Sequence, residues 1–301
     1  MSSCSDSSSC SSGGSSCGGG GGTSAKMALQ DAMISDTLSQ IRYKIFVTSG
    51  KGGVGKSSVS VNLAAALAQK GYKVGLLDVD IHGPSVHVLL GLEGQLDIDR
   101  GSLLHPKRFS DNLHVVSMAS LLEDPDQAVL WRGPKKVALI RQFVSDVQWG
   151  ELDFLIIDSP PGTGDEPMTI LKTMPEALCL VVTTPQEVSL ADVRKSVNFL
   201  QYARANVLGV VENMSGLICP HCSGAIDLFK KGGGRELAEK YGLEFMGDIP
   251  LDPATVVAGD TGVPVVMMDI DTPAKEALLK VADNVAYAAE SSLEAASTTH
   301  K

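Results

Sequence analysis

The segment G-K-G-G-V-G-K-S at residues 50–57 constrains the fold of this chain more than any other feature of its sequence. It follows the pattern G-x-x-x-x-G-K-[S/T], and it lies between a strand-like run at residues 43–48 and a helical pattern at residues 59–70. In this context the glycines permit a tight turn whose N–H groups converge on phosphate oxygens, and the following helix adds its positive N-terminal end. The sequence therefore predicts a loop that binds the phosphates of a nucleotide.

Each position of this loop has an expected part in binding ATP with Mg²⁺. Lys56 is expected to reach the β- and γ-phosphates, and the Ser57 hydroxyl is expected to be a ligand of Mg²⁺. The basic pattern does not need the second lysine, Lys51, which either faces solvent or stabilises transferring phosphate on the nucleotide of a second subunit. The residues of this segment predicted to contact the nucleotide are Gly50, Lys51, Gly52, Gly53, Val54, Gly55, Lys56, Ser57 and Ser58.

Strand-like runs alternate with helical patterns over residues 42–290, which are predicted to form one P-loop ATPase domain with the C-x-x-C segment as an insertion. Runs such as F-L-I-I at residues 154–157 are apolar throughout, as expected when helices cover both faces of a parallel sheet. The alternation predicts an α/β fold with a doubly wound, mostly parallel sheet that binds ligands at the carboxyl ends of its strands. Strands are predicted at residues 43–48, 73–77, 113–117, 153–157, 177–182, 207–211 and 244–246, and helices at residues 59–70, 135–147, 190–203, 235–241 and 274–289.

The two ends of the chain are predicted to differ from this domain. Residues 1–25 consist largely of Ser, Gly and Cys, and a segment so poor in apolar side chains is expected to be a disordered tail. Residues 26–41 carry apolar side chains at roughly helical spacing and are predicted to form a helix that docks on the domain. Residues 291–301 are expected to be a disordered C-terminus.

Aspartates at two strand ends are expected to complete the site. Asp158 ends the apolar run at residues 154–157 and is expected to hold Mg²⁺ through a coordinated water. Asp80 follows the run at residues 73–77 and is expected to orient the attacking water. Asp78 fits a turn or a helix cap as well as it fits a catalytic role. The predicted catalytic residues are therefore Lys51, Lys56 and Asp80.

Cys219 and Cys222 form a C-x-x-C pair, and two thiolates at this spacing can bind one metal from the same turn. The chain contains no second C-x-x-C, so this pair is half of a four-cysteine site. The other half can come from cysteines of the N-terminal tail or from the same pair in a symmetry-related subunit, which would suit a [4Fe–4S] cluster or zinc. A dithiol redox pair and a structural zinc knuckle are the competing interpretations. Cys179 lies in an apolar run and is predicted to be a core residue.

In combination, these motifs resemble the Mrp/ApbC-type iron–sulfur cluster carriers, which belong to the MinD/ParA-like class of P-loop ATPases. The resemblance covers roughly residues 41–289 and rests on six stretches in the same order, at residues 49–57, 78–85, 131–134, 149–165, 211–215 and 219–222. The tail departs from the pattern. Relatives with an N-terminal cluster carry four cysteines there, including a close pair, whereas this tail has three widely spaced ones, Cys4, Cys10 and Cys17. They are expected to form a transient loading site or no site.

The resemblance implies an ATP-dependent homodimer, or a heterodimer with a close relative. The C-x-x-C pairs of both subunits would bridge a labile [4Fe–4S] cluster, received from a scaffold and delivered to apo-proteins. ATP hydrolysis would be slow and would gate cluster binding and transfer. The resemblance also implies that Lys51 crosses the dimer interface and that Asn213 contacts the adenine.

The charge balance bears on other classes of function. The net charge is −10, from 25 basic and 35 acidic side chains, which argues against a nonspecific binder of nucleic acid. No apolar run reaches the ~18 to 20 residues that span a bilayer, and the N-terminus does not resemble a signal peptide, so a cytoplasmic protein without a membrane partner is expected. Two alternative functions are a spatial organiser that binds DNA or membrane as an ATP-bound dimer, and an ATP-gated redox protein. The organiser has no use for Cys219 and Cys222.

Overall fold

The computed structural model describes residues 21–81, 83–99, 103–121, 133–219, 221–222, 224–226 and 228–299. Its strands are β1 (Ile41–Ser49), β2 (Val74–Asp78), β3 (Asp97–Ile98), β4 (Leu104–His105), β5 (Lys107–Ser110), β6 (Leu113–Ser117), β7 (Leu152–Asp158), β8 (Leu178–Thr183), β9 (Asn206–Ile218), β10 (Ala225–Ile226) and β11 (Phe245–Leu251). Its helices are α1 (Gly21–Ser39), α2 (Lys56–Gln69), α3 (Val86–Leu89), α4 (Gly133–Asp146), α5 (Asp165–Thr173), α6 (Glu187–Tyr202), α7 (Gly233–Tyr241), α8 (Pro253–Thr261) and α9 (Pro273–Thr299). Short 3₁₀ turns lie at Met118–Leu121 and Val265–Met267.

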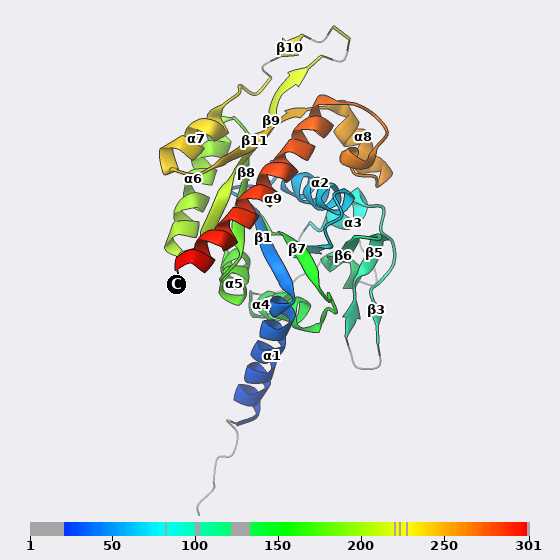
Figure 1. Ribbon diagram of the computed structural model, residues 1–301, viewed down its shortest axis with the longest axis vertical. Helices are drawn as coiled ribbons and strands as arrows, with labels where there is room; N and C mark the ends of the chain where they lie inside the picture. Colours follow the sequence, from blue (N-terminus) through cyan, green and yellow to red (C-terminus); the bar gives the residue numbers. More distant parts are fainter. Residues whose placement is uncertain are drawn as a thin grey trace, which may run out of the picture.

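The main sheet has the strand order β10-β9-β8-β1-β7-β2-β6-β5, and β11 also pairs with β9 (Figure 1). Within the described residues its pairs are parallel, except that β5 runs antiparallel to β6 and β10 antiparallel to β9. The strands β3 and β4 form a separate small ribbon. The predicted doubly wound, mostly parallel sheet is therefore confirmed, and it brings the carboxyl ends of β1, β2, β7, β8 and β9 to one edge.

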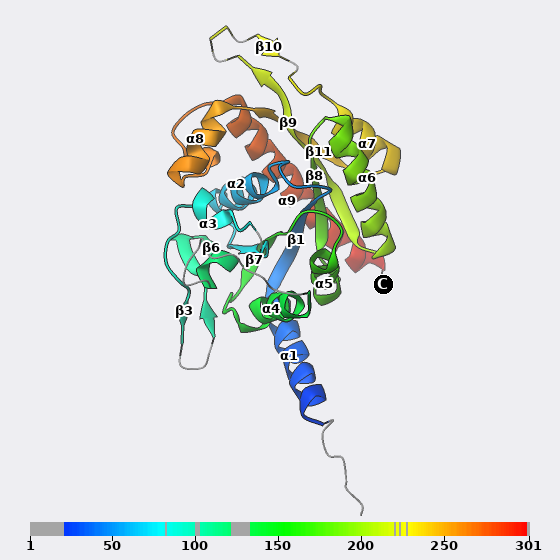
Figure 2. The ribbon, with the colours of Figure 1, turned by 180° about the vertical axis from the view of Figure 1, so that it is seen from behind.

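Helices cover both faces of this sheet. α2, α8 and α9 lie on the face turned to the viewer in Figure 1, whereas α4, α5, α6 and α7 lie on the face seen in Figure 2. Successive side chains of β1 belong to different cores: Ile45 and Val47 pack in the α2–α9 cluster, and Phe46 packs in the opposite one. This alternation explains why residues 45–47 of β1 are all apolar, because both faces of the strand are buried there.

Most element positions agree with the sequence predictions, but several lengths do not. β9 was expected at residues 207–211, yet it continues to Ile218 because β10 and β11 pair with its second half. The expectation of a disordered C-terminus from residue 291 is wrong as far as Thr299, since α9 continues that far. No Gly or Pro follows Pro273 within this helix, so nothing in its backbone chemistry ends it earlier.

The N-terminal helix α1 begins at Gly21, earlier than the predicted residue 26, and it packs against α4. Arg141 of α4 donates to Gln30 at 3.2 Å and forms an ion pair with Asp31, while Ile34 is buried in the core below. Most of the predicted tail at residues 1–25 lies outside the described residues. Along the part of the chain that the structure describes, no helix is both long enough and apolar enough to cross a membrane.

Candidate nucleotide site and cysteine hairpin

The phosphate loop connects β1 to α2 at the carboxyl edge of the sheet. A Cβ on Gly50 would lie 2.5 Å from backbone atoms of Asp192 and Val193, so only glycine lets the loop approach α6 this closely. Gly53 and Gly55 have φ values of +78° and +79°, in the left-handed region that glycine adopts at little cost. Among the described residues, no side chain caps the N-terminus of α2. Its first N–H groups are therefore available to phosphate oxygens.

The buried carboxylate of Asp158 joins the residues predicted to handle phosphate and metal. One of its oxygens accepts hydrogen bonds from Lys56 Nζ at 2.8 Å and from Ser60 Oγ at 2.7 Å. The other accepts from Ser57 Oγ at 2.6 Å. The side chain of Asp158 is 0% exposed and that of Lys56 only 7%, so the pair is screened from water. The hydroxyl of Ser57 and the carboxylate of Asp158 form an oxygen donor set of the kind that Mg²⁺ prefers.

Ser60 is a member of this network that the sequence analysis missed. It lies one helical turn after Lys56, and its hydroxyl also donates to the Lys56 carbonyl at 3.1 Å. The two residues are four positions apart, which places both on one side of α2. This spacing is the feature of the sequence that could have predicted the role of Ser60.

Asp78 lies beside Asp158, its register partner on the adjacent strand. It is fully buried, and its oxygens accept from Ser117 Oγ and from the backbone N–H of Asp80, each at 3.0 Å. Burial raises the pKa of Asp78 to about 8, and the charge of Asp158 adds to this effect, while hydrogen bonds and Lys56 oppose it. Asp78 therefore belongs to the buried part of the site, next to Asp158. Its sequence position alone fitted a turn as well as a catalytic role.

Asp80 and Lys51 lie in the loops around this buried group. Asp80 is half-buried in the turn after β2, where its Oδ1 accepts from the N–H of Gly83 at 3.2 Å. The same turn is held to β7, because Val79 N–H donates to the carbonyl of Asp158 at 3.0 Å. Lys51 is half-buried next to the exposed Gly52, and its carbonyl accepts from Ser49 Oγ at 2.9 Å.

Asn213 reaches the phosphate loop from β9. Its amide donates to the carbonyl of Val54 at 2.9 Å, across 159 positions of sequence. A Cβ on Gly55 would lie 2.2 Å from Asn213 Nδ2, so glycine at this position makes room for the amide. The structure therefore brings Asn213 together with the loop.

The cysteine pair occupies a hairpin that projects from the body of the protein at the end of β9 (Figures 1 and 2). Cys219 N–H donates to the Gly224 carbonyl at 2.9 Å, and β10 closes the hairpin against Leu217 and Ile218. Backbone N–H groups of His221 and Cys222, together with the Cys222 side chain, donate to the sulfur of Cys219 and lower the pKa of its thiol. Donors that converge on a thiolate in this way favour metal binding.

Within the described residues, no group of three or more His, Cys, Asp or Glu side chains is arranged to hold a metal ion. Cys219 and Cys222 are both free thiols, and the described residues of one subunit add no third ligand to them. The tail cysteines Cys4, Cys10 and Cys17 lie outside the described residues. Cys179 is buried as predicted, and burial raises the pKa of its thiol to about 12.

Comparison with known proteins shows the family of this chain. The family described as ParA, NUBPL iron-transfer P-loop NTPase, matches residues 40–286. The chain belongs to this family. It is 48% identical over 248 residues to the iron-sulfur cluster carrier protein of Methanocaldococcus jannaschii, covering 82% of this chain and 86% of the relative. It is 47% identical over 253 residues to the human cytosolic Fe-S cluster assembly factor NUBP2, covering 82% and 93% of the two chains.

Solved structures share the P-loop fold of this family. A nucleotide-binding protein from Archaeoglobus fulgidus, in complex with ADP, superposes with a TM-score of 0.69 at 37% identity, covering 81% of this chain and 98% of the other. The cell division ATPase MinD of Pyrococcus furiosus superposes with a TM-score of 0.62 at 25% identity, over 81% of this chain and 98% of the other. The MinD/ParA-like P-loop fold and the similarity to the cluster carriers are thus confirmed. Of the motifs that carried this resemblance, W-R at residues 131–132 lies outside the described residues.

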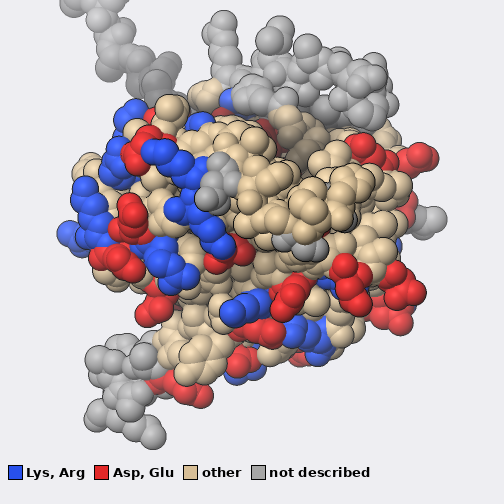
Figure 3. Space-filling view, turned by 90° about the horizontal axis from the view of Figure 1, so that it is seen from above, with Lys and Arg blue, Asp and Glu red and all other residues tan. Residues whose placement is uncertain are grey.

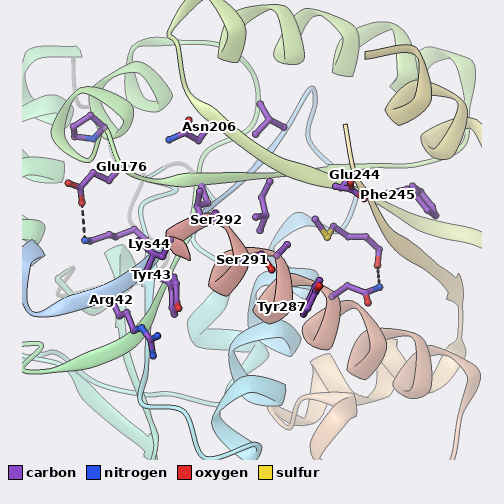
Figure 4. A pocket seen from close by; sticks show the side chains of 18 residues that line it. Arg42, Tyr43, Lys44, Glu176, Asn206, Glu244, Phe245, Tyr287, Ser291 and Ser292 are labelled. Carbon is purple, nitrogen blue, oxygen red and sulfur yellow. Dashed lines mark hydrogen bonds and ion pairs between the residues drawn. The ribbon is translucent and has the colours of Figure 1, made fainter. Parts of the chain in front are cut away.

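The surface around the hairpin and a separate cavity are shown in Figures 3 and 4. Figure 3 looks at the end of the molecule that carries the hairpin, where uncharged side chains occupy the centre and basic side chains gather on the side of α6 and α7. A separate cavity of about 1050 Å³ lies at the amino-terminal ends of β1, β8 and β9, beside residues 284–293 of α9 (Figure 4). Lys44 and Glu176, which form an ion pair at 3.4 Å, lie in the wall of this cavity. No residue of the phosphate loop lines this cavity, which is at the edge of the sheet opposite to the loop.

Proposed function

We propose that this protein is an ATP-dependent carrier of iron–sulfur clusters in the cytoplasm. Two subunits would each contribute Cys219 and Cys222 to one labile [4Fe–4S] cluster at their interface, and the cluster is the cargo that passes to apo-proteins. The observation that carries the proposal is the projecting hairpin with the C-x-x-C pair (Figure 1), in which Cys219 is half-buried and Cys222 is exposed. Two such thiols can supply two of the four ligands of a cluster shared between subunits. The names of the NUBPL-type relatives point to the same cargo.

In this proposal ATP hydrolysis is slow and serves to switch the dimer. Water attacks the γ-phosphorus, the bond to the β–γ bridging oxygen breaks, and ADP and phosphate leave. Lys56 stabilises charge on the transferring phosphate, Asp80 orients the water, and Lys51 reaches the nucleotide of the other subunit. Bound Mg²⁺, held by Ser57 and through a water by Asp158, would neutralise charge on the phosphate oxygens.

The nucleotide contacts in the proposal are those of residues 50–58, with Asn213 at the adenine. The hydrogen bond from Asn213 to Val54 supports this, because it keeps the amide at the loop that binds the phosphates. The same amide has a second hydrogen, which can donate to a base nitrogen while the bond to Val54 persists.

The decisive experiment is anaerobic reconstitution of the full-length protein with iron and sulfide, followed by absorbance, metal analysis and sizing. We expect about four irons per dimer. The double variant Cys219→Ala/Cys222→Ala should lose the cluster and keep nucleotide binding. The matched control, Cys4→Ala/Cys10→Ala/Cys17→Ala, should keep the bridged cluster.

Other outcomes would contradict this proposal in different ways. One zinc per dimer without an iron–sulfur chromophore would make the cysteine pair structural. Equal iron content in the Cys219/Cys222 double variant and the unmodified protein would move the cargo site elsewhere. Loss of nucleotide binding together with the cluster would remove the separation between the two sites that the proposal requires.

A further inference from the structure

Strand β9 touches the phosphate loop with two adjacent side chains. Asn213 donates to the Val54 carbonyl at 2.9 Å. A Cβ on Gly55 would lie 2.2 Å from the Asn213 amide nitrogen and 3.6 Å from Met214 Cε, so both side chains lie against the loop. Any displacement of Val54 and Gly55 on binding phosphate must therefore displace β9 or break these contacts.

The neighbouring residue, Glu212, is tied to the other leg of the cysteine hairpin. One carboxylate oxygen accepts from Ser215 Oγ at 2.6 Å and from Gly232 N–H at 2.9 Å, and the other accepts from Gly234 N–H at 2.5 Å. Glu212 is 0% exposed, and in the described part of the chain it forms no ion pair. A buried carboxylate satisfied only by hydrogen-bond donors holds those donors firmly, because losing one leaves its charge poorly solvated.

Along the chain, the cysteine hairpin lies between Glu212 and the glycines that it binds, Gly232 and Gly234. Its outgoing leg is the end of β9, and its returning leg reaches Gly232 just before α7. Glu212 therefore joins the two legs at their base, as a clasp that makes Cys219 and Cys222 move with β9. Without the clasp the returning leg would still be held by the pairing of β10 with β9, by the ion pair of Lys231 with Asp248 at 3.1 Å, and by α7.

The backbone between the loop contacts and the hairpin is bent into an uncommon conformation. Met214 has φ of +58° and Gly216 has φ of +74°, both in the left-handed region. The register between β9 and β11 shifts at the same level, between Ile249 and Leu251. A non-glycine residue in this conformation persists only where its surroundings fix it, and here the surroundings include the phosphate loop.

We propose that residues 212–216 of β9 couple occupancy of the phosphate loop to the exposure and reactivity of the Cys219–Cys222 pair, with Glu212 as the positioning residue. The loop acts on Asn213 and Met214, the bent segment carries the displacement, and Glu212 transfers it to both legs of the hairpin. This deepens the proposed function and rests on it only in taking the cysteine pair as the cargo site. The coupling itself is a property of the cluster-free protein.

The test uses the full-length, reduced, cluster-free protein and a short pulse of iodoacetamide, with and without saturating Mg-ADP. Mass spectrometry of the peptide containing residues 219–222 reads alkylation of this pair apart from the other cysteines. In the unmodified protein we expect Mg-ADP to change the alkylation rate several-fold. Glu212→Gln should abolish this response, because its amide NH₂ then faces an N–H donor. Ser215→Ala removes one donor and should reduce the response.

The matched control is Glu236→Gln, which removes an exposed carboxylate from the first turn of α7 and should leave the response intact. If Glu212→Gln does not fold, Ser215→Ala decides the question by itself. A Glu212→Gln rate that is altered equally with and without Mg-ADP would overturn the proposal, since it assigns Glu212 a purely structural role. An unmodified protein that does not respond to Mg-ADP would overturn it as well.

The coupling and the carrier function fail separately. Normal iron uptake with no nucleotide response at the cysteines overturns the coupling and leaves the carrier function in place. A nucleotide-dependent alkylation rate without any iron uptake on reconstitution overturns the carrier function and supports the coupling.

Discussion

The phosphate site and the cysteine hairpin are built in opposite ways. The carboxylate of Asp158 accepts hydrogen bonds from Lys56, Ser57 and Ser60, and both this carboxylate and the lysine are screened from water. The hairpin projects into solvent, its turn is held by single backbone bonds, and Cys222 is exposed. A site that stabilises developing charge benefits from fixed donors in a dry environment. A site that must load and release cargo needs access to its thiols.

This difference has consequences for stability. Substitutions in the phosphate site should cost folding free energy as well as function, because they disturb buried charge. Substitutions at the tip of the hairpin should change metal binding and leave the fold nearly unaffected, since little is buried there. Variants chosen from the buried phosphate site outward to the exposed hairpin tip test this gradient.

The largest effect is expected for Asp158→Asn. It leaves Lys56 buried without its carboxylate and should lower the free energy of unfolding by about 3–5 kcal/mol. The control is Asp153→Asn on the same strand, whose carboxylate accepts one hydrogen bond from Lys73 N–H at 2.8 Å in an exposed setting. That change should cost only about 1 kcal/mol. Urea unfolding measures the loss of stability in each variant. Equal losses in the two variants would contradict the importance of the buried pair of Asp158 and Lys56.

The pH dependence of stability should report on Asp78. Its pKa is raised from 3.8 to about 8 in the folded protein, so the folded state binds more protons than the unfolded state between these values. Its contribution is complete below the unfolded pKa and is lost as pH rises through the folded pKa, by up to about 1.4 kcal/mol per pH unit.

The measurement is urea unfolding of metal-free protein from pH 5 to pH 9. Asp78→Asn cannot titrate, so its stability should decline less steeply over this range than that of the unmodified protein. Parallel curves for the two proteins would show that another group sets the slope.

A smaller effect separates two glycines of the phosphate loop. Gly53→Ala and Gly55→Ala both place a side chain at a positive φ, which costs about 1 kcal/mol. Nothing lies within 4 Å of a Cβ at Gly53, whereas one at Gly55 would clash with Asn213 at 2.2 Å. Gly55→Ala should therefore weaken ADP binding at least about tenfold more than Gly53→Ala. Calorimetry of ADP binding compares the two variants. Equal affinities would contradict the contact of Asn213 with the loop.

The smallest effect on stability is expected at the hairpin tip. Cys222→Ala removes an exposed thiol and should change the free energy of unfolding by less than about 0.5 kcal/mol. Its iron content after reconstitution should nevertheless fall sharply. The matched comparison is Cys179→Ala, which empties a buried position in β8 and should cost about 1–2 kcal/mol with no loss of iron. The reverse ranking of the two variants would contradict the gradient.

Local patterns were enough to predict much of the fold and of the candidate site. The glycine and lysine spacing of residues 50–57, the apolar runs that end in Asp78 and Asp158, and the C-x-x-C pair are each contained in a few consecutive residues. Parallel strands that are apolar on both faces produce a strong signal, because burial on two sides removes polar residues. Elements with weaker signals, such as α5 and α8, were missed, although Asp252 and Pro253 mark the start of α8 with a cap and a first-turn proline.

Neighbouring residues alone specify the phosphate loop, the order of strands and helices, and the thiol pair. Which of these side chains meet depends on the tertiary structure. Asp158 joins Lys56 across 102 positions, Asn213 joins Val54 across 159, and Glu212 closes the hairpin onto Gly232. Such contacts depend on strand order and register, which place β1, β7 and β2 side by side and β9 beyond β8. No local pattern encodes these distances, because they arise only when the sheet has formed and buried both of its faces.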